Sequence, residues 1–242
     1  MRARSAREAI AFLTPLGLTT VPSPRALRWF PAVGAGIGLA EGIIWRGARR
    51  RWPALPAAVV AVVADIALTG GLHLDGVADT ADGLFAHAPA KGRLDIMAEP
   101  ATGAFGTIAI ATAVVARTAA LAEMDASPLL LAAALGGSRS VMVLAMRLMP
   151  YARKDGLASA FLAGEHGEAG SIVAGAVGAV AAAALAGIAR GWCGLLGAGA
   201  GYAAAAAVLG CARRRLGGFT GDVLGAAGVA AETVGLLWAA RR

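Results

Sequence analysis

Long apolar segments, separated by short polar ones, follow one another along almost the whole chain. Seven of them approach the roughly 20 residues that an α-helix needs to cross a bilayer. Lipid offers the backbone no hydrogen-bond partner, so such segments cross as helices. The pattern predicts an all-α polytopic membrane protein with about six to seven transmembrane helices, in a single domain over residues 1–242. The predicted spans cover residues 29–45, 55–72, 104–121, 129–149, 172–189, 195–209 and 223–240.

The first 28 residues differ from the rest. Residues 5–18 carry apolar side chains after a basic start, which predicts a short amphipathic helix on the membrane surface. A Pro-rich stretch at 21–24 ends this helix, so residues 1–28 are expected to form an interfacial segment. The first predicted span contains Glu41 and is followed by four arginines on the side opposite to the cytoplasm, so an irregular span is expected there and the total is about six to seven.

The amino-acid composition supports a membrane protein and indicates which kinds of partner it binds. Hydrophobic residues make up 58% of the chain and charged residues 15%, whereas soluble domains carry about 25% charged residues. The net charge of +7 comes largely from basic residues at the ends of apolar segments, where they orient helices and bind anionic headgroups. Membrane lipid is therefore an expected partner and nucleic acid is not. The oligomeric state stays open, with a homo-oligomer as one alternative.

The distribution of basic residues also predicts a topology. With the amino terminus in the cytoplasm and seven alternating spans, more Lys and Arg residues fall in cytoplasmic segments than on the opposite side. The same topology brings three polar loops, residues 73–100, 150–168 and 211–222, to one membrane face. We therefore expect a multi-pass protein of the cell membrane whose active site faces the cytoplasm.

The most informative polar stretch runs from Gly70 to Gly83 and holds three aspartates. Asp75, Asp79 and Asp82 are spaced i, i+4 and i+7, which places them on one face of a helix. A solvated helix start explains one or two of these residues but not three on one face. Like charges at this spacing repel, and Mg²⁺ would relieve the repulsion while leaving positions for phosphate oxygens. The pattern predicts a magnesium site.

Glycines, a histidine and two further acids surround these aspartates. Gly71 and Gly76 leave the backbone open to a closely approaching ligand. His73 is a phosphate contact or a catalytic base, with a structural interfacial histidine as the alternative. Asp95 and Glu99 are again i and i+4, and they either add to the metal site or are ordinary surface acids.

Several arginines lie in or beside apolar spans, where a charge is costly and marks a function or a buried partner. Arg139 and Arg153 suit phosphate, because the guanidinium fork is bidentate. The alternative is pairing with a buried acid or snorkelling to the interface. For Arg117 the alternative is an ion pair with Glu123 or another buried acid.

A glycine-rich loop at residues 217–222 precedes the last predicted span. The amides around Gly218 and Thr220 can face a ligand, and Asp222 is either a helix cap or a further ligand. Acids, arginines and glycine loops on one membrane face together indicate chemistry on a phosphate or diphosphate. A cation would neutralise charge on the leaving group, and an aspartate would take a proton from an attacking hydroxyl.

These motifs closely resemble those of the cobalamin synthase family, the adenosylcobinamide-GDP ribazoletransferases. They occur in the same order over nearly the full length, so the resemblance is specific. They are the run Thr69-Gly-Gly-Leu-His-Leu-Asp-Gly-Val-Ala-Asp-Thr-Ala-Asp-Gly83, Arg93-Leu-Asp-Ile-Met97 with Gly103 and Gly106, Ser138-Arg139, Tyr151-Ala-Arg153 with Gly156-Leu157, and Gly217-Gly-Phe-Thr-Gly-Asp-Val-Leu-Gly-Ala226.

The resemblance implies an Mg²⁺-dependent integral membrane enzyme of late cobalamin synthesis. Such an enzyme joins adenosylcobinamide-GDP to α-ribazole, or to α-ribazole 5′-phosphate, and releases GMP. It implies that Asp75, Asp79 and Asp82 hold the metal on the diphosphate and that Arg93 contacts substrate. The loop around Ala98 and Glu99 is less cationic than is usual in the family.

Two other classes fit part of the pattern. A CDP-alcohol phosphotransferase also cleaves a diphosphate with an acidic helix face, but its motif has an Ala-Arg after the first Asp-Gly and a longer gap to the last acids. An ion-coupled transporter would use Asp65, Arg117 and Arg139 as coupling residues. The chain shows no internal repeat, and its polar residues cluster on one face, which favours the enzyme.

Overall fold

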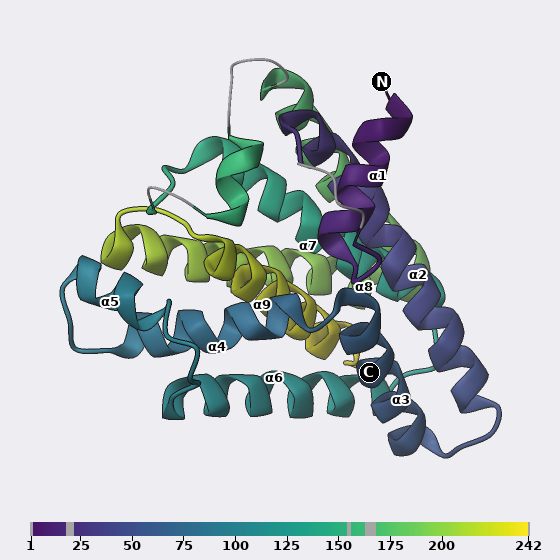
Figure 1. Cartoon of the computed structure of the whole chain (residues 1–242). Helices are drawn as coiled ribbons and strands as arrows, with labels where there is room; N and C mark the ends of the chain where they lie inside the picture. The colour runs from purple at the N-terminus through teal and green to yellow at the C-terminus, as the bar shows by residue number, and fades with distance from the viewer. Residues whose placement is uncertain (1, 18–21, 154–155, 163–167, 242) are drawn as a thin grey trace.

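A computed structural model describes residues 2–17, 22–153, 156–162 and 168–241, and Figure 1 shows their arrangement. Within these ranges the chain is helical, and its extended pairing is limited to one isolated parallel bridge between Tyr151 and Phe219. The predicted all-α fold is confirmed. The elements are α1 (Arg2–Leu13), η1 (Pro24–Trp29), α2 (Phe30–Arg49), α3 (Ala54–Thr69), α4 (Leu72–Phe85), α5 (Ala90–Ile96), α6 (Ala104–Ala122), α7 (Pro128–Leu148), η2 (Leu157–Phe161), α8 (Glu168–Leu216) and α9 (Gly221–Ala239).

Among the described residues, four helices are long and apolar enough to cross a membrane: α6, α7, α8 and α9. α3 and α4 meet at a 90° bend and add a fifth span if the pair is counted as one. This number of helices is lower than the predicted six to seven spans, in part because both legs of α8 are counted as one helix. α3 has only 16 residues, which is short for a bilayer. α2 carries Glu41 and Arg46, whose charges lower its mean hydropathy.

α8 is counted once here, although it contains two of the predicted spans. Its helical geometry breaks at Gly191, whose φ is +58°. The two halves fold back on each other, since the Tyr202 hydroxyl donates a hydrogen bond to the carbonyl of Ala179 at 2.7 Å. A β-carbon on Gly194 would lie 1.9 Å from the carbonyl oxygen of Ala186. The predicted fifth and sixth spans are therefore the two legs of one helical hairpin.

α7 packs against α2, α8 and α9 and is buried along most of its length. α2 approaches it closely because Gly34, Gly38 and Gly42 face it at i, i+4 and i+8. β-Carbons at these positions would lie 2.2 to 2.6 Å from backbone atoms of α7. Small residues at helix contacts are a general means of association in lipid, where close packing drives helices together.

Two glycines turn the chain between α3 and α4. Gly70 and Gly71 have φ values of +65° and +72°, a region that favours glycine. The amide of Gly71 donates to the carbonyl of Ile66 at 3.0 Å and completes the end of α3. After the turn, α4 packs mainly against α9 and α6. This glycine pair therefore determines where the three aspartates lie.

The helix predicted near the amino terminus is present, but α1 packs on protein instead of lying only on lipid. Ala9 and Leu13 are buried. The ring of Phe12 stacks on that of Phe30 in α2, with centroids 5.8 Å apart, and meets Phe161 edge-on at 4.7 Å. The apolar face of α1 finds a complementary surface on η1, α2 and η2, so burial against protein replaces the expected burial in headgroups.

Candidate active site

The three predicted aspartates all lie in α4 and share one face of it, as their spacing requires. Asp79 interacts repulsively with Asp75, Asp82 and Asp222 and attractively with Arg153. Four carboxylates therefore share a region with one guanidinium, which leaves the region strongly negative. A binding site for a cation or for a cation–phosphate complex has this charge balance.

Asp82 has a role that the sequence did not suggest. Its two carboxylate oxygens accept hydrogen bonds from the amides of Gly103, at 2.7 Å, and Gly106, at 2.9 Å. These amides begin α6, where the helix dipole is positive and favours an anion. A β-carbon on Gly106 would lie 2.4 Å from the Asp82 carboxylate. Asp82 therefore ties α4 to the start of α6, and both glycines are required for that contact.

The polar loops predicted to share one face do converge on α4. Arg153 forms an ion pair with Asp222 at 3.2 Å, and the same nitrogen donates to the carbonyl of Met97 at 3.2 Å. One side chain thus joins residues of the regions 73–100, 150–168 and 211–222. Thr220 begins α9 by accepting a hydrogen bond from the amide of Val223 at 3.2 Å, and this cap fixes the position of Asp222.

The glycines that were predicted to face a ligand allow the backbones of neighbouring elements to pack closely. A β-carbon on Gly76 would lie 2.7 Å from the carbonyl oxygen of Asp222, so α4 and α9 touch here. A β-carbon on Gly218 would lie 2.1 Å from the carbonyl oxygen of Pro150. The amide of Phe219 donates to that carbonyl at 2.9 Å. Gly71 is the left-handed residue before α4, as described above.

The carboxylate oxygens of this region are ligands of the kind that a hard divalent cation binds, and they outnumber the positive charges beside them. As placed, the described residues contain no three acidic, His or Cys side chains that could together hold a metal ion. Asp75, Asp79 and Asp222 repel one another electrostatically across the α4–α9 contact. Glu99, also predicted as a ligand, lies exposed in the turn after α5.

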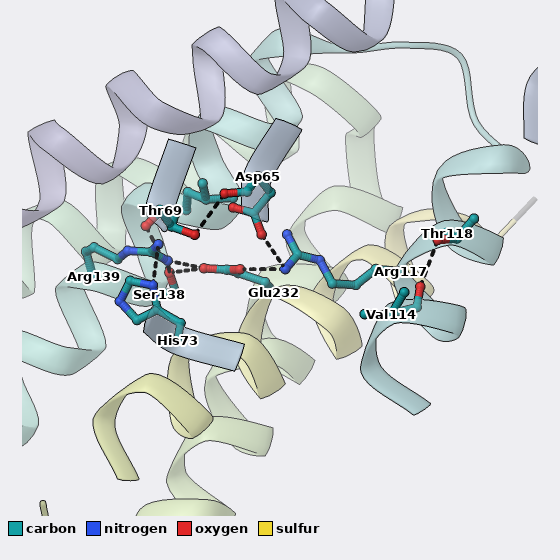
Figure 2. Close-up of polar contacts among 10 residues, drawn as sticks. Asp65, Thr69, His73, Val114, Arg117, Thr118, Ser138, Arg139 and Glu232 are labelled. Carbon is teal, nitrogen blue, oxygen red and sulfur yellow. Dashed lines mark hydrogen bonds and ion pairs between the residues drawn. The ribbon is translucent and has the colours of Figure 1, made fainter. Parts of the chain in front are cut away.

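A buried ion-pair network lies behind this site, and Figure 2 shows it. Arg117 contacts Asp65 at 2.8 Å and Glu232 at 3.4 Å. Glu232 also pairs with Arg139, whose other terminal nitrogen lies 3.3 Å from Nδ1 of His73. Arg139 is only 1% exposed, so the structure places it in a buried ion pair, the alternative to the predicted phosphate contact.

The network fixes the protonation of His73. A guanidinium can only donate hydrogen bonds, so Nδ1 of His73 must accept and the ring proton lies on Nε2. His73 also lines a cavity of about 120 Å³ together with Tyr151, Arg153, Asp222 and Gly225. With Nδ1 accepting from Arg139, the ring can offer a hydrogen-bond donor at Nε2 and no free base at Nδ1.

Arg93 holds the other end of α4. Its Nη1 donates to the carbonyls of Gly83 at 3.0 Å and Leu84 at 2.5 Å. Arg215 of α8 donates to the carbonyl of Leu84 as well. Both arginines thus satisfy carbonyls that a helix end leaves unpaired. Arg93 was predicted to bind substrate, and the structure places it as a cap.

Comparison with known proteins decides the family. The model of the cobalamin-5-phosphate synthase family matches residues 5–240. The chain belongs to this family. Relatives named adenosylcobinamide-GDP ribazoletransferase include one from Syntrophobacter fumaroxidans, 39% identical over 90% of this chain and 87% of its own. Another, from Chlorobaculum tepidum, is 35% identical over 92% of this chain and 91% of its own. A third, from Escherichia coli, is 35% identical over 88% of this chain and 86% of its own. No solved structure matches the chain.

Membership of the cobalamin-5-phosphate synthase family confirms the resemblance seen in the motifs. Sequence reasoning nevertheless missed Glu232, the acid shared by Arg117 and Arg139. A signal was present: Arg117, Arg139 and Arg147 lie inside predicted spans, and Asp65 can neutralise only one of them. Glu232, like Glu41, is a further acid inside a predicted span and was a candidate partner.

Proposed function

We propose that this chain transfers the adenosylcobinamide-phosphate group of adenosylcobinamide-GDP to α-ribazole, or to its 5′-phosphate, and releases GMP. The family match and the names of its relatives support this activity. The observation that carries it within the structure is the convergence of the α4 carboxylates with Arg153 and Asp222. Such an arrangement would supply both acidic ligands for a metal ion and a cation for a diphosphate.

The proposed reaction is an in-line displacement at phosphorus. The 5′-oxygen of ribazole attacks the phosphorus nearer the cobinamide, and a new P–O bond forms. The bond from that phosphorus to the bridging oxygen breaks, and the bridging oxygen leaves with GMP. The hydroxyl proton passes to a carboxylate of α4. Mg²⁺ held by Asp75, Asp79 and Asp222 would neutralise negative charge on the diphosphate.

The other residues position the reactants. Arg153 would exchange part of its contact with Asp222 for a phosphate oxygen, for which its planar fork is suited. His73 would donate its Nε2 proton to a phosphate, consistent with the tautomer that Arg139 imposes. Asp82 would hold α4 against α6, a structural role. On this proposal the site lies on the cytoplasmic side of the cell membrane.

The buried network argues against the transporter alternative. That alternative required Asp65, Arg117 and Arg139 as mobile coupling charges. In the structure these residues form one ion-paired set with Glu232, and each of them is at most 5% exposed. Such a set is costly to disrupt and serves better as a fixed support for α4.

The proposal is tested with purified protein in liposomes. Wild type, Asp79→Asn and the control Asp95→Asn are incubated with adenosylcobinamide-GDP, α-ribazole and Mg²⁺, and GMP is measured. Asp95 is exposed on α5, so its variant should match wild type, while Asp79→Asn should lose activity by about 100-fold or more. Absence of GMP with folded wild type would refute the activity. Wild-type turnover by Asp79→Asn would refute the role of the carboxylate.

A further inference from the structure

α4 has a second face, opposite to its aspartates, that no part of the proposed reaction uses. Val77, Ala81 and Leu84 lie on it, about half a helical turn from the carboxylates at 100° per residue. They line an apolar groove of about 800 Å³ whose other walls come from α6, the second half of α8 and α9. The catalytic helix is thus the wall between a polar site and an apolar groove.

The groove opens sideways between helices that cross the membrane. Its walls include Ile108 of α6, which is 63% exposed, and Phe85 and Phe105, which are 58% and 50% exposed. The rings of Phe85 and Phe105 pack with centroids 5.6 Å apart at one end of the groove. Side chains of this kind on spanning helices face hydrocarbon. The groove therefore suits an acyl chain.

Basic residues gather at that same end. Arg215 of α8 reaches the carbonyl of Leu84, a groove residue, and Arg93 reaches it from α5. Arg214, the residue before Arg215, is exposed and follows the groove residues Ala207 and Cys211 at i+7 and i+3, on the same face of α8. Among the described ion pairs, none involves Arg214. The mouth of the groove thus offers free positive charge directly beyond an apolar channel.

We propose that this groove binds one anionic phospholipid, with an acyl chain between α6 and α8 and its headgroup phosphate on Arg214. Charge complementarity selects an anionic lipid over a zwitterionic one, since clustered arginines at a helix end bind acidic headgroups. The bound chain would pack on Val77, Ala81 and Leu84 and support α4 from behind. Lipid binding does not depend on the proposed function, whereas its effect on turnover does.

The test compares phospholipid retention in three proteins. Wild type, Arg214→Gln and the control Arg213→Gln are placed in nanodiscs of phosphatidylcholine with about 20% phosphatidylglycerol. The control removes the same charge from an exposed position on the opposite face of α8. After transfer to detergent, native mass spectrometry measures the phosphatidylglycerol that stays bound, and GMP release is measured in parallel.

Wild type and the control should retain about one phosphatidylglycerol, while Arg214→Gln should bind it about fivefold more weakly. Equal phosphatidylglycerol retention by Arg214→Gln and the control would overturn the proposal. So would retention of phosphatidylcholine by wild type as strongly as phosphatidylglycerol. A mass of two chains without bound lipid would overturn it too, because a second copy would then fill the groove. Selective lipid retention without any GMP release would instead support the lipid site and refute only the enzymatic function.

Discussion

Replacing Glu232 by Gln removes one negative charge from the centre of the buried network and keeps the side chain's size. Glu232 is 2% exposed and pairs with both Arg117 and Arg139. Arg117 would retain Asp65 at 2.8 Å, but Arg139 would lose its carboxylate partner. Removing one partner of a buried ion pair typically costs about 3–5 kcal/mol. For a chain of this length, that loss corresponds to a fall in Tm of roughly 10 °C.

The assay is thermal unfolding in detergent, read by the loss of monodisperse protein after heating. Asp125→Asn is the matched control, because it removes one negative charge from an exposed position between α6 and α7, and its Tm should stay within about 1 °C of wild type. The double variant Glu232→Met/Arg139→Met should be less destabilised than the sum of its single variants, since no charge is left unpaired. A Tm of Glu232→Gln equal to that of the control would refute the reasoning.

Three further predictions concern the site. Gly106→Ala should lower turnover at least about tenfold, because the added β-carbon would displace Asp82. The control Gly36→Ala, whose β-carbon would meet nothing within 4 Å, should match wild type. Equal turnover of the two variants would contradict the role of the Asp82–Gly106 contact. Arg153→Ala should raise the KM for adenosylcobinamide-GDP about tenfold through loss of a charged hydrogen bond. The control is Arg51→Ala, at an exposed position. A KM of Arg153→Ala equal to that of the control would make Arg153 a structural residue. Removing divalent ions with EDTA should abolish GMP release and Mg²⁺ should restore it, whereas undiminished activity in EDTA would exclude the metal.

Features encoded over short distances could be read from the sequence. Asp75, Asp79 and Asp82 share a helix face because a helix repeats every 3.6 residues. The convergence of the three polar loops followed from alternating topology. The position of α4 was harder to predict, since the 90° bend depends on the left-handed conformations of Gly70 and Gly71. Glycine tolerates many conformations, so its presence alone did not show which one the chain adopts.

Partners far apart in the sequence could not be assigned. Arg117 and Asp65 are separated by 52 positions, and Arg139 and Glu232 by 93. The sequence shows that such charges need partners but not which partners pack together. Asp82 is similar: a carboxylate that binds metal and one that caps another helix look alike in sequence. Only the packing of α4 against α6 reveals the contacts of Asp82 with Gly103 and Gly106.

The same limit explains the number of spans. Apolar length was a good guide to α6, α7 and α9, whose bounds lie within two residues of those predicted. It could not show that residues 172–189 and 195–209 belong to one hairpin. It also could not show that α2, with Glu41 buried inside the bundle, is held by contact with α7 more than by lipid.

The most direct test of the proposed transfer follows the oxygen atom that forms the new bond. α-Ribazole labelled with ¹⁸O in its 5′-hydroxyl is incubated with adenosylcobinamide-GDP, Mg²⁺ and the purified protein, and both products are analysed by mass spectrometry. Attack at the phosphorus nearer the cobinamide predicts that all the label appears in the cobalamin product and that the GMP is unlabelled. Label in a guanosine-containing product, with release of cobinamide phosphate, would contradict it.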